Sequence, residues 1–417
     1  MEKGYKFRIY PNEEQKIQME KTCGCCRFVY NHYLSERIEV YKEEDKKLTL
    51  NECNKDLTSL KQSEESNWLK DVDKFALYYS LDNLDKAYDN FFREKEKGNN
   101  NQGFPNFKKK HKSKKRYKTA YTNGNIEVGE DYVKLPKLGK VKAVIHRSVE
   151  GRIINATVEH SSSDKYYVSI GCTDIICHDI TTLDMVIKSV FPYILEIPYL
   201  VYMNVNSLER IKSKDNYIGV DLGITHFAID SNGLKYENNK YYRKEEKKLG
   251  YNQKKLSKKV PGSKRYRKQR IKVARLHEKI RNQRRDYLAK LSSKLINENQ
   301  VICLEDLAVS NMVRNEKLSK AISEVSWAEF RRMVEYKAHW YGKQVLIVDR
   351  FYASSKTCSS CGYKLETLDL SVREWLCPQC NLLHDRDINA AKGLLKEGLN
   401  KLRGRNCPRS EPVELPQ

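Results

Sequence analysis

Four cysteines near the C-terminus constrain this chain more than any other feature of its sequence. Residues 358–361 read CSSC and residues 377–380 read CPQC, so fifteen residues separate two Cys-x-x-Cys pairs. This spacing predicts a zinc ribbon in which Cys358, Cys361, Cys377 and Cys380 hold one Zn²⁺ ion. Because four thiolates leave zinc no open coordination position, we expect a structural ion and not a catalytic one. A redox-active cysteine pair would need a thioredoxin-like context, which the sequence lacks.

Other candidate ligands near and far from this motif have simpler interpretations. His384 follows the last cysteine closely, but four sulfurs already complete the site. Cys23, Cys25 and Cys26 sit together in the N-terminal part. We expect them to be core residues on a helix, because free cysteine packs as a small hydrophobic side chain.

Length and charge narrow the class of protein. A chain of 417 residues has room for about three domains, and 39% hydrophobic with 32% charged residues is typical of a folded, soluble protein. The net charge of +23 suggests a polyanionic partner. The N-terminus lacks the apolar core of a signal peptide, and no run of about 18 uncharged apolar residues occurs. We therefore expect no membrane partner and a cytoplasmic, reducing location, where clustered cysteines bind metal.

The C-terminal half has an α/β pattern. Apolar strands are expected within residues 216–233, 300–309 and 344–351, and an amphipathic helix at 325–342. The first of these segments reads NYIGVDLGITHFAIDSNG, which predicts two strands joined at Gly223 and an Asn-Gly turn after the second. Strand, hairpin, helix and strand in this order indicate a mixed sheet.

Three carboxylates stand at comparable places in this pattern. Asp221 and Glu305 each end an expected strand, and Asp387 begins an expected helix. Strand ends of an α/β sheet meet at one edge, so these side chains can converge there. Clustered carboxylates repel one another, and two Mg²⁺ ions would cancel that repulsion and support phosphodiester hydrolysis. Taken singly, an acidic residue at a strand end is more commonly a cap or loop residue.

The N-terminal half begins with an expected strand at 6–10, followed by a helix that starts in PNEEQ. A second helix is expected at 74–95. From 124 to 172 the sequence alternates in short strands, which predicts a small β-barrel.

Two segments are strongly basic. Eight Lys and Arg residues with interleaved aromatics occupy 103–118, and residues 243–290 hold 20 Lys and Arg against four acidic residues. Such runs are commonly solvated surface, but this density of one charge favours contact with phosphates, and aromatic rings stack on bases. The predicted nucleic-acid contacts are Phe107, Lys108, Lys109, Lys110, Lys112, Lys114, Lys115, Arg116, Arg265, Arg267, Lys268, Arg270, Arg281, Arg284 and Arg285.

Together these motifs resemble one family, the TnpB/OrfB proteins of insertion sequences. GVDLGI with Asp221, CLEDL with Glu305 and HDRDINAA with Asp387 are similar to its three RuvC blocks. SSKTCSSCG and LSVREWLCPQC are similar to its zinc-ribbon insertion, and YKFRIYPNEEQ, RFVYNHYLSER and GFPNFKKK to its N-terminal region. In the family pattern the neighbouring Asp385 is not a metal ligand.

The resemblance implies a multidomain α+β protein. A wedge-like β-barrel would comprise 1–10 and 119–172, with a helical recognition part inserted at 11–118. An RNase H-like (RuvC) α/β nuclease would occupy 215–355, a zinc ribbon 356–383, a closing helix 384–400 and a tail 401–417. Residues 173–214, apolar and with two prolines, depart from the family's short linker and are expected to be a linker or insertion of unknown role.

The implied activity is RNA-guided DNA cleavage for a transposon. Asp221, Glu305 and Asp387 would hold two catalytic Mg²⁺ ions, and the partners would be a guide RNA and a double-stranded DNA target beside a short recognition motif. A compact type V CRISPR effector is the nearest alternative and differs mainly in the source of the guide. A guide-directed DNA-binding regulator, an actin-like ATPase and a non-catalytic zinc-ribbon protein each leave one of these motifs unexplained.

Overall fold

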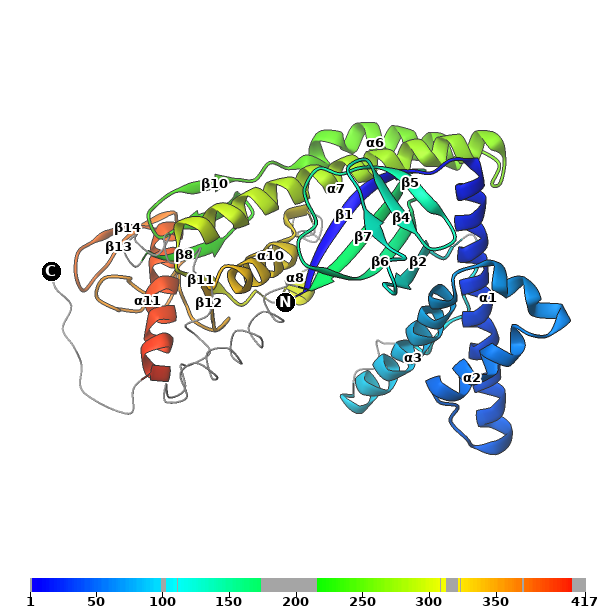
Figure 1. The fold of residues 1–417 in the computed structure, drawn as a ribbon. Helices are drawn as coiled ribbons and strands as arrows, with labels where there is room; N and C mark the ends of the chain where they lie inside the picture. The colour runs from blue at the N-terminus through cyan, green and yellow to red at the C-terminus, as the bar shows by residue number, and fades with distance from the viewer. Residues whose placement is uncertain are drawn as a thin grey trace, which may run out of the picture. The chain divides into compact units, whose positions relative to one another are not determined.

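The computed structural model describes residues 2–98, 103–110, 112–173, 216–307, 309–312, 322, 324–369 and 371–406 (Figure 1). The chain divides into two compact units, residues 1–193 and 194–417. Of the expected insertion at 173–214, only Thr173 belongs to the described residues. The part of the expected tail beyond Asn406 lies outside them too.

A seven-stranded antiparallel sheet forms the centre of the first unit. Its order is β2-β6-β7-β1-β5-β4-β3, with the N-terminal strand β1 between β7 and β5. Side chains alternate between a buried and an open face, as in β7, where every second residue is buried. The strands are β1 (Glu2–Tyr10), β2 (Lys115–Ala120), β3 (Glu127–Val128), β4 (Tyr132–Leu135), β5 (Gly139–Val144), β6 (Arg152–His160) and β7 (Tyr166–Thr173).

The predicted β-barrel is wrong in that the sheet does not close. Within the described part of the chain, the edge strands β2 and β3 pair only with β6 and β4 respectively. Residues 121–126 connect these two edges and can span at most about 25 Å, whereas seven flat strands would extend over about 29 Å. The sheet must therefore curl. Because β3 has only two residues, it offers too few backbone groups to close the remaining gap.

Helices pack against this sheet within the first unit. The helices are α1 (Glu13–Glu44), α2 (Leu50–Leu60), the 3₁₀ helix η1 (Glu64–Asp71) and α3 (Lys74–Glu96). Asn12 and Gln15 form a capping box that begins α1 within the expected PNEEQ segment. The helix predicted at 74–95 is confirmed by α3. Cys25 and Cys26 are buried on α1, which confirms that they are core residues.

The second unit contains the mixed sheet that the sequence predicts. Its order is β10-β9-β8-β11-β12, in which β11 runs parallel to both neighbours and β9 runs antiparallel to β8. The strands are β8 (Tyr217–Leu222), β9 (His226–Asp230), β10 (Lys235–Glu237), β11 (Val301–Glu305) and β12 (Gln344–Val348). Gly233, in the Asn-Gly turn after β9, has a φ of 90°, a conformation that glycine adopts readily.

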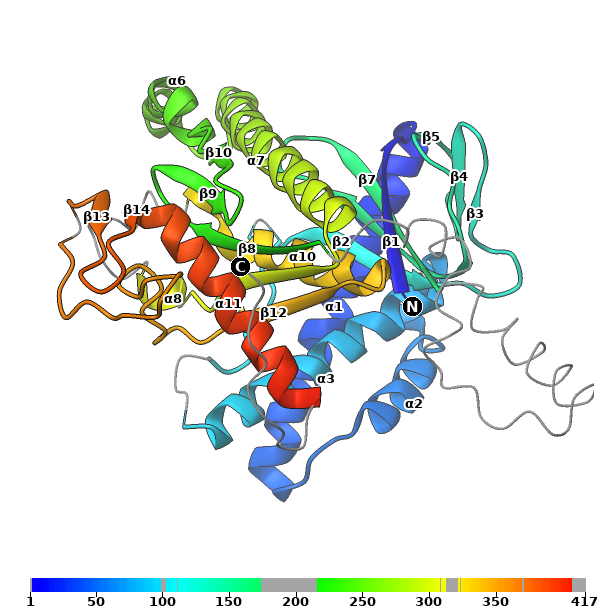
Figure 2. The same cartoon turned by 90° about the vertical axis from the view of Figure 1, so that its left-hand side faces the viewer.

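Different helices cover the two faces of this sheet. Helix α11 (Arg386–Asn406) crosses β8, β11 and β12 (Figure 2). Apolar residues of α7 (Lys264–Glu298) and α10 (Trp327–Trp340) share a core with Ile218, Val220 and Ile302 of the sheet. Helix α6 (Tyr241–Ser257) packs on α7, and α8 (Val309–Met312) is a short turn after β11.

A small ribbon precedes α11. Strands β13 (Glu374–Leu376) and β14 (Leu383–Asp385) pair antiparallel, and an isolated bridge joins Thr357 to Lys364. Trp375 packs with Cys358 and Cys377 in a core of its own. In the described residues no helix has the length and apolar character needed to cross a membrane.

Candidate active site and metal centre

The alternation of side chains along β8 and β11 places two of the three predicted carboxylates on one face of the sheet. Cys303 is paired with Gly219 across the parallel strands, and Glu305 and Asp221 follow two positions later on each. Residues two apart on a strand point to the same side. Asp221 and Glu305 therefore share the face of Gly219 and Cys303, which is the face that α11 covers.

Glycine at position 219 allows α11 to approach closely enough to add the third carboxylate. A Cβ atom on Gly219 would meet the carbonyl oxygen of Ala391 and the amide nitrogen of Leu395 at less than 3.0 Å. Only a residue without a side chain fits there, so the helix backbone rests directly on β8. Asp387, one turn before Ala391, is thereby brought to the end of β8 that carries Asp221.

The first turn of α11 is held by a residue beside Asp387. The Asp385 carboxylate accepts hydrogen bonds from the backbone N–H groups of Asp387 and Ile388, at 3.0 and 3.1 Å, and so caps the helix. Its other oxygen lies 2.8 Å from Lys235 Nζ. Asp385 thus has a structural role, while the Asp387 carboxylate remains available and has Arg373 Nη1 at 3.7 Å.

The other two carboxylates act electrostatically on Asp221. Burial raises the pKa of Asp221 to about 7, with further contributions from the negative charges of Glu305 and Asp387. Burial, together with the charge of Asp306, also raises the pKa of Glu305. Such a cluster costs free energy when it ionises without a cation. Hard oxygen ligands of this kind are what Mg²⁺ prefers, so the donor set fits that ion.

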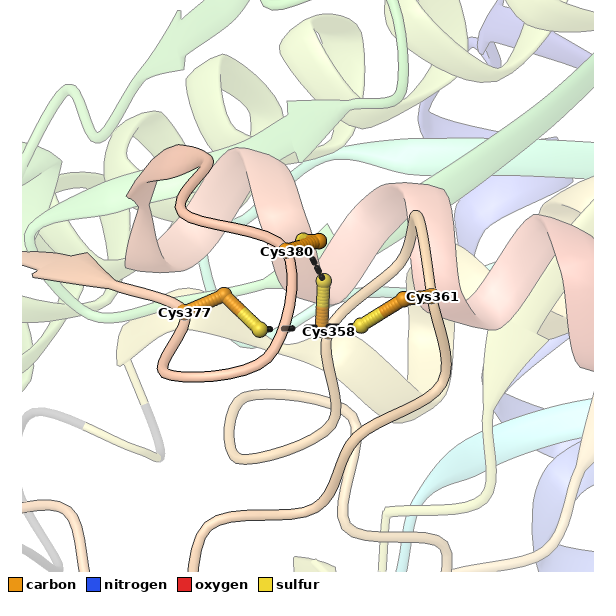
Figure 3. A group of neighbouring side chains, drawn as sticks. All are labelled: Cys358, Cys361, Cys377 and Cys380. Carbon is orange, nitrogen blue, oxygen red and sulfur yellow. Dashed lines mark hydrogen bonds between the residues drawn. The ribbon is translucent and has the colours of Figure 1, made fainter.

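The four predicted zinc ligands converge on one point (Figure 3). Their Sγ atoms all lie within 4.8 Å of one another, with 3.7 Å between Cys358 and Cys380 and 3.6 Å between Cys361 and Cys377. A tetrahedral Zn²⁺ with Zn–S bonds of about 2.3 Å requires S–S distances of about 3.8 Å. The cluster is therefore compatible with structural zinc. The oxygens of Asp221, Glu305 and Asp387 do not form so compact a group.

The local structure also lowers the pKa of one of the four thiols, that of Cys377. Burial raises the pKa of the Cys377 thiol, but the backbone N–H groups of Cys380 and Gln379 and the neighbouring thiols more than offset this effect. The pKa of Cys377 falls to about 7. Since zinc binds thiolate and not thiol, this residue is a suitable first ligand.

Asn389, which the sequence analysis does not identify, connects the ribbon to α11. Asn389 is 1% exposed; it donates to the carbonyl oxygens of Ser354 and Thr357 and accepts from the backbone N–H of Ser359. His384 Nε2 lies 3.0 Å from Cys358 Sγ, so it contacts a ligand and is not needed as a fifth one. The signal that could have found Asn389 is its position two residues after Asp387, inside an otherwise apolar helix turn.

The first basic segment lies partly on the surface and partly in contacts within the first unit. Phe107, Lys109, Lys110, Lys112, Lys114 and Arg116 are exposed. Lys115 Nζ lies 2.6 and 2.7 Å from the two Glu20 oxygens. Lys108 Nζ lies 3.5 Å from the centre of the Tyr30 ring, and burial lowers the pKa of Lys108 to about 8. These two lysines already have partners, which the sequence could not indicate.

The second basic segment forms α6 and α7. Arg265, Arg267, Lys268, Arg270, Arg281 and Arg285 are exposed on α7. Arg284 is half-buried, and its Nη1 lies 3.4 Å from the Glu324 carbonyl oxygen. The predicted contacts on α7 thus form an exposed cationic surface, with Arg284 at its inner edge.

Comparison with known protein families agrees with the sequence motifs described above. Residues 197–316 match the OrfB_IS605 family, described as "Probable transposase", and residues 327–394 match the Cas12f1-like TNB domain. Residues 1–46 match the helix-turn-helix domain HTH_OrfB_IS605. A protein of Streptomyces pristinaespiralis named "Putative RNA-guided DNA endonuclease" is 33% identical over 404 residues, which is 96% of this chain and 90% of that protein. The chain belongs to the TnpB/OrfB family.

A second sequence relative agrees with the TnpB/OrfB assignment. InsQ of Escherichia coli K12, which bears the same name, is 30% identical and covers 94% of this chain and 92% of its own length. A solved Cas12f1–sgRNA–target DNA complex aligns over 95% of this TnpB/OrfB chain and 99% of its own, at 16% identity and a TM-score of 0.34. The assignment rests on the sequence relatives alone.

Proposed function

We propose that this TnpB/OrfB protein is an RNA-guided DNA endonuclease of a transposon. Two relatives that match it over at least nine-tenths of its length carry that activity in their names. The observation that carries the proposal is the packing of α11 on Gly219, which brings Asp387 to the sheet face of Asp221 and Glu305. The second unit would then be a RuvC, or RNase H-like, nuclease with an inserted zinc ribbon.

The proposed reaction is hydrolysis of a phosphodiester bond. Asp221, Glu305 and Asp387 would together hold two Mg²⁺ ions, which would supply Lewis-acid stabilisation and lower the pKa of a water molecule. A water oxygen then bonds to phosphorus, the bond from phosphorus to a sugar oxygen breaks, and that oxygen takes up a proton.

The raised pKa of Asp221 should make cation binding depend on pH. At neutral pH its carboxyl group is partly protonated, and it must lose that proton to act as a ligand. We therefore expect cation binding, and cleavage with it, to strengthen as the pH rises from 6 to 8.

The proposed zinc site is structural and holds one ion. The ribbon would fix the start of α11 through Asn389 and bring Arg373 beside Asp387. In this way the zinc ion would support the catalytic carboxylates without contacting the substrate.

The proposed partners are a guide RNA and a double-stranded DNA target that carries a short adjacent motif. The exposed cations of α7 would bind the phosphates of the guide or of the heteroduplex. The match to an insertion-sequence family favours a transposon over a CRISPR source of the guide. None of the described cysteines forms a disulfide, which fits the cytoplasmic location proposed here.

Substitution of Asp221 tests the proposal. The protein is purified with its co-expressed RNA, and Mg²⁺-dependent cleavage of a plasmid with a guide-matched target is measured. Asp221→Ala is expected to abolish cleavage, because it removes a cation ligand, while binding of RNA and target persists. Asp286→Ala, an exposed carboxylate on α7, is the matched control and should cleave normally. Residual cleavage by Asp221→Ala would show that another site cuts the DNA.

Sequencing the RNA that co-purifies with the protein tests the guide requirement. A single RNA species that ends in a sequence from beside a transposon end is expected. RNA derived from a repeat array would instead support the CRISPR alternative.

A further inference from the structure

A cavity lies at the carboxyl end of β11, beside helix α10. Its volume is about 540 Å³, within the range of sites that hold small ligands. Glu305 lines it, as does Leu222, the residue after Asp221. Helix α10 contributes Trp327 and Arg331, and Arg350 comes from the segment after β12. The cavity therefore connects one predicted catalytic carboxylate to a pair of arginines.

A single carboxylate holds these two arginines. Arg331 Nη1 donates to Asp306 Oδ1 at 2.6 Å, and Arg350 donates to Asp306 Oδ2 through Nη2 and through Nε at 3.1 Å. Asp306 is the residue after Glu305, and its backbone N–H bonds to the Val348 carbonyl oxygen at 3.0 Å. The arginine pair is thus fixed to the sheet next to Glu305.

The pair retains donors for a further anion. A guanidinium group has five N–H donors. Two donors of Arg350 bind Asp306; one of Arg331 binds Asp306 and another binds Glu335 Oε1 at 2.8 Å. The side chains of Arg331 and Arg350 are 34% and 46% exposed, so solvent reaches both groups. Each of the two guanidinium groups therefore keeps three N–H donors that neither Asp306 nor Glu335 takes up.

Building on the function proposed above, we propose that Arg331 and Arg350 bind the DNA phosphate next to the bond that is cut, with its nucleotide in the cavity. A planar guanidinium fork matches the oxygens of a phosphate group better than an ammonium group does. Asp306 is a positioning residue, because it sets the orientation of both forks without contacting the substrate. The apolar wall formed by Leu222 and Trp327 suits the sugar or the base.

A chemical double-mutant cycle tests this assignment. The target strand is synthesised with one uncharged methylphosphonate linkage in place of the phosphate next to the cleaved bond, at each side in turn. Cleavage by the guide-loaded protein in Mg²⁺ is measured for wild type and for Arg350→Ala, with both substrates. Each single change is expected to slow cleavage about 10- to 100-fold, as for loss of a charge-assisted hydrogen bond. The two changes together should cost no more than either one alone.

Arg350→Lys and Lys70→Ala complete the experiment. Arg350→Lys keeps the charge but not the fork, so an intermediate rate is expected. Lys70→Ala removes an exposed charge on η1, outside the predicted nucleic-acid contacts, and should leave cleavage of both substrates unaffected. Thermal unfolding checks that each variant is folded. If Arg350→Ala does not fold, Asp306→Asn replaces it, because this change keeps the shape of the side chain and tests how the two arginines are positioned.

The outcomes separate the two proposals. If wild-type protein cuts DNA but the losses from the linkage and from Arg350→Ala multiply, the arginine assignment is wrong and the endonuclease function stands. If wild-type protein does not cut a guide-matched target, the proposed function itself fails.

Discussion

Asp221 illustrates how a residue acquires its properties from its neighbours. In an unfolded chain its pKa would be near the ordinary value of 3.8, and burial with two nearby negative charges raises it to about 7. A residue whose folded pKa is raised contributes less stability as the pH rises. The loss begins above pH 4 and is complete above pH 7. Without metal, Asp221 is therefore expected to destabilise the fold at neutral pH.

The first prediction concerns Asp221→Asn in chelator. The uncharged amide removes the repulsion, so the free energy of unfolding is expected to rise by about 1–3 kcal/mol at pH 8. The gain should shrink as the pH falls towards 5, because wild-type Asp221 then binds a proton. Thermal unfolding of both proteins at pH 5 and 8 measures this difference. Equal unfolding midpoints for wild type and Asp221→Asn at pH 8 would mean that the Asp221 carboxylate does not destabilise the fold.

At the scale of elements, the ribbon and α11 work as a pair. The helix is held to β8 through Gly219 and to the ribbon through Asn389, and both contacts lie within two turns of Asp387. The ribbon buries little apolar surface, with Trp375 as its largest core residue. So small an element depends on its metal for stability.

The second prediction follows for Cys361→Ser. Loss of one thiolate from four is expected to reduce bound zinc from about one ion per chain to near zero after dialysis, and to lower the yield of folded protein. Zinc is measured by atomic emission on the purified chain. Cys23→Ser, a partly buried thiol on α1, is the control and should keep its zinc. Full zinc occupancy in Cys361→Ser, with altered turnover only, would contradict a structural role.

At the scale of the whole molecule, charge is unevenly distributed along the chain. Residues 243–290 carry a net charge of +16 from 20 basic and four acidic residues, out of +23 in total. Several of these cations are exposed on α7, which makes this helix the strongest candidate surface for a polyanion.

The third prediction concerns that surface. Changing exposed α7 cations to Gln should weaken RNA binding about 10- to 100-fold near 150 mM salt and reduce its salt dependence, because fewer counterions are released. Filter binding across a salt series measures both. The variant changes Arg265, Arg267, Lys268 and Arg270, and a control variant changes the exposed Lys42, Lys46, Lys70 and Lys95. An equal loss of RNA affinity in the control variant would indicate only a general effect of net charge.

Local patterns in the sequence were sufficient for much of this protein. The spacing of four cysteines predicts a metal-binding ribbon because zinc geometry needs only short loops. Alternating and helical periodicities predict β8, β11, β12 and α10 because burial acts residue by residue.

Contacts between distant segments decided the rest. The curl and the open edge of the first sheet depend on how far residues 121–126 reach, and a strand pattern does not encode that. The convergence of Asp387 on Asp221 depends on a missing side chain at Gly219, and the partners of Lys108 and Lys115 lie far away on α1. The sequence by itself determined which chemical groups are present and which elements carry them. Only the tertiary structure decided which groups meet, because burial and charge act through space and not along the chain.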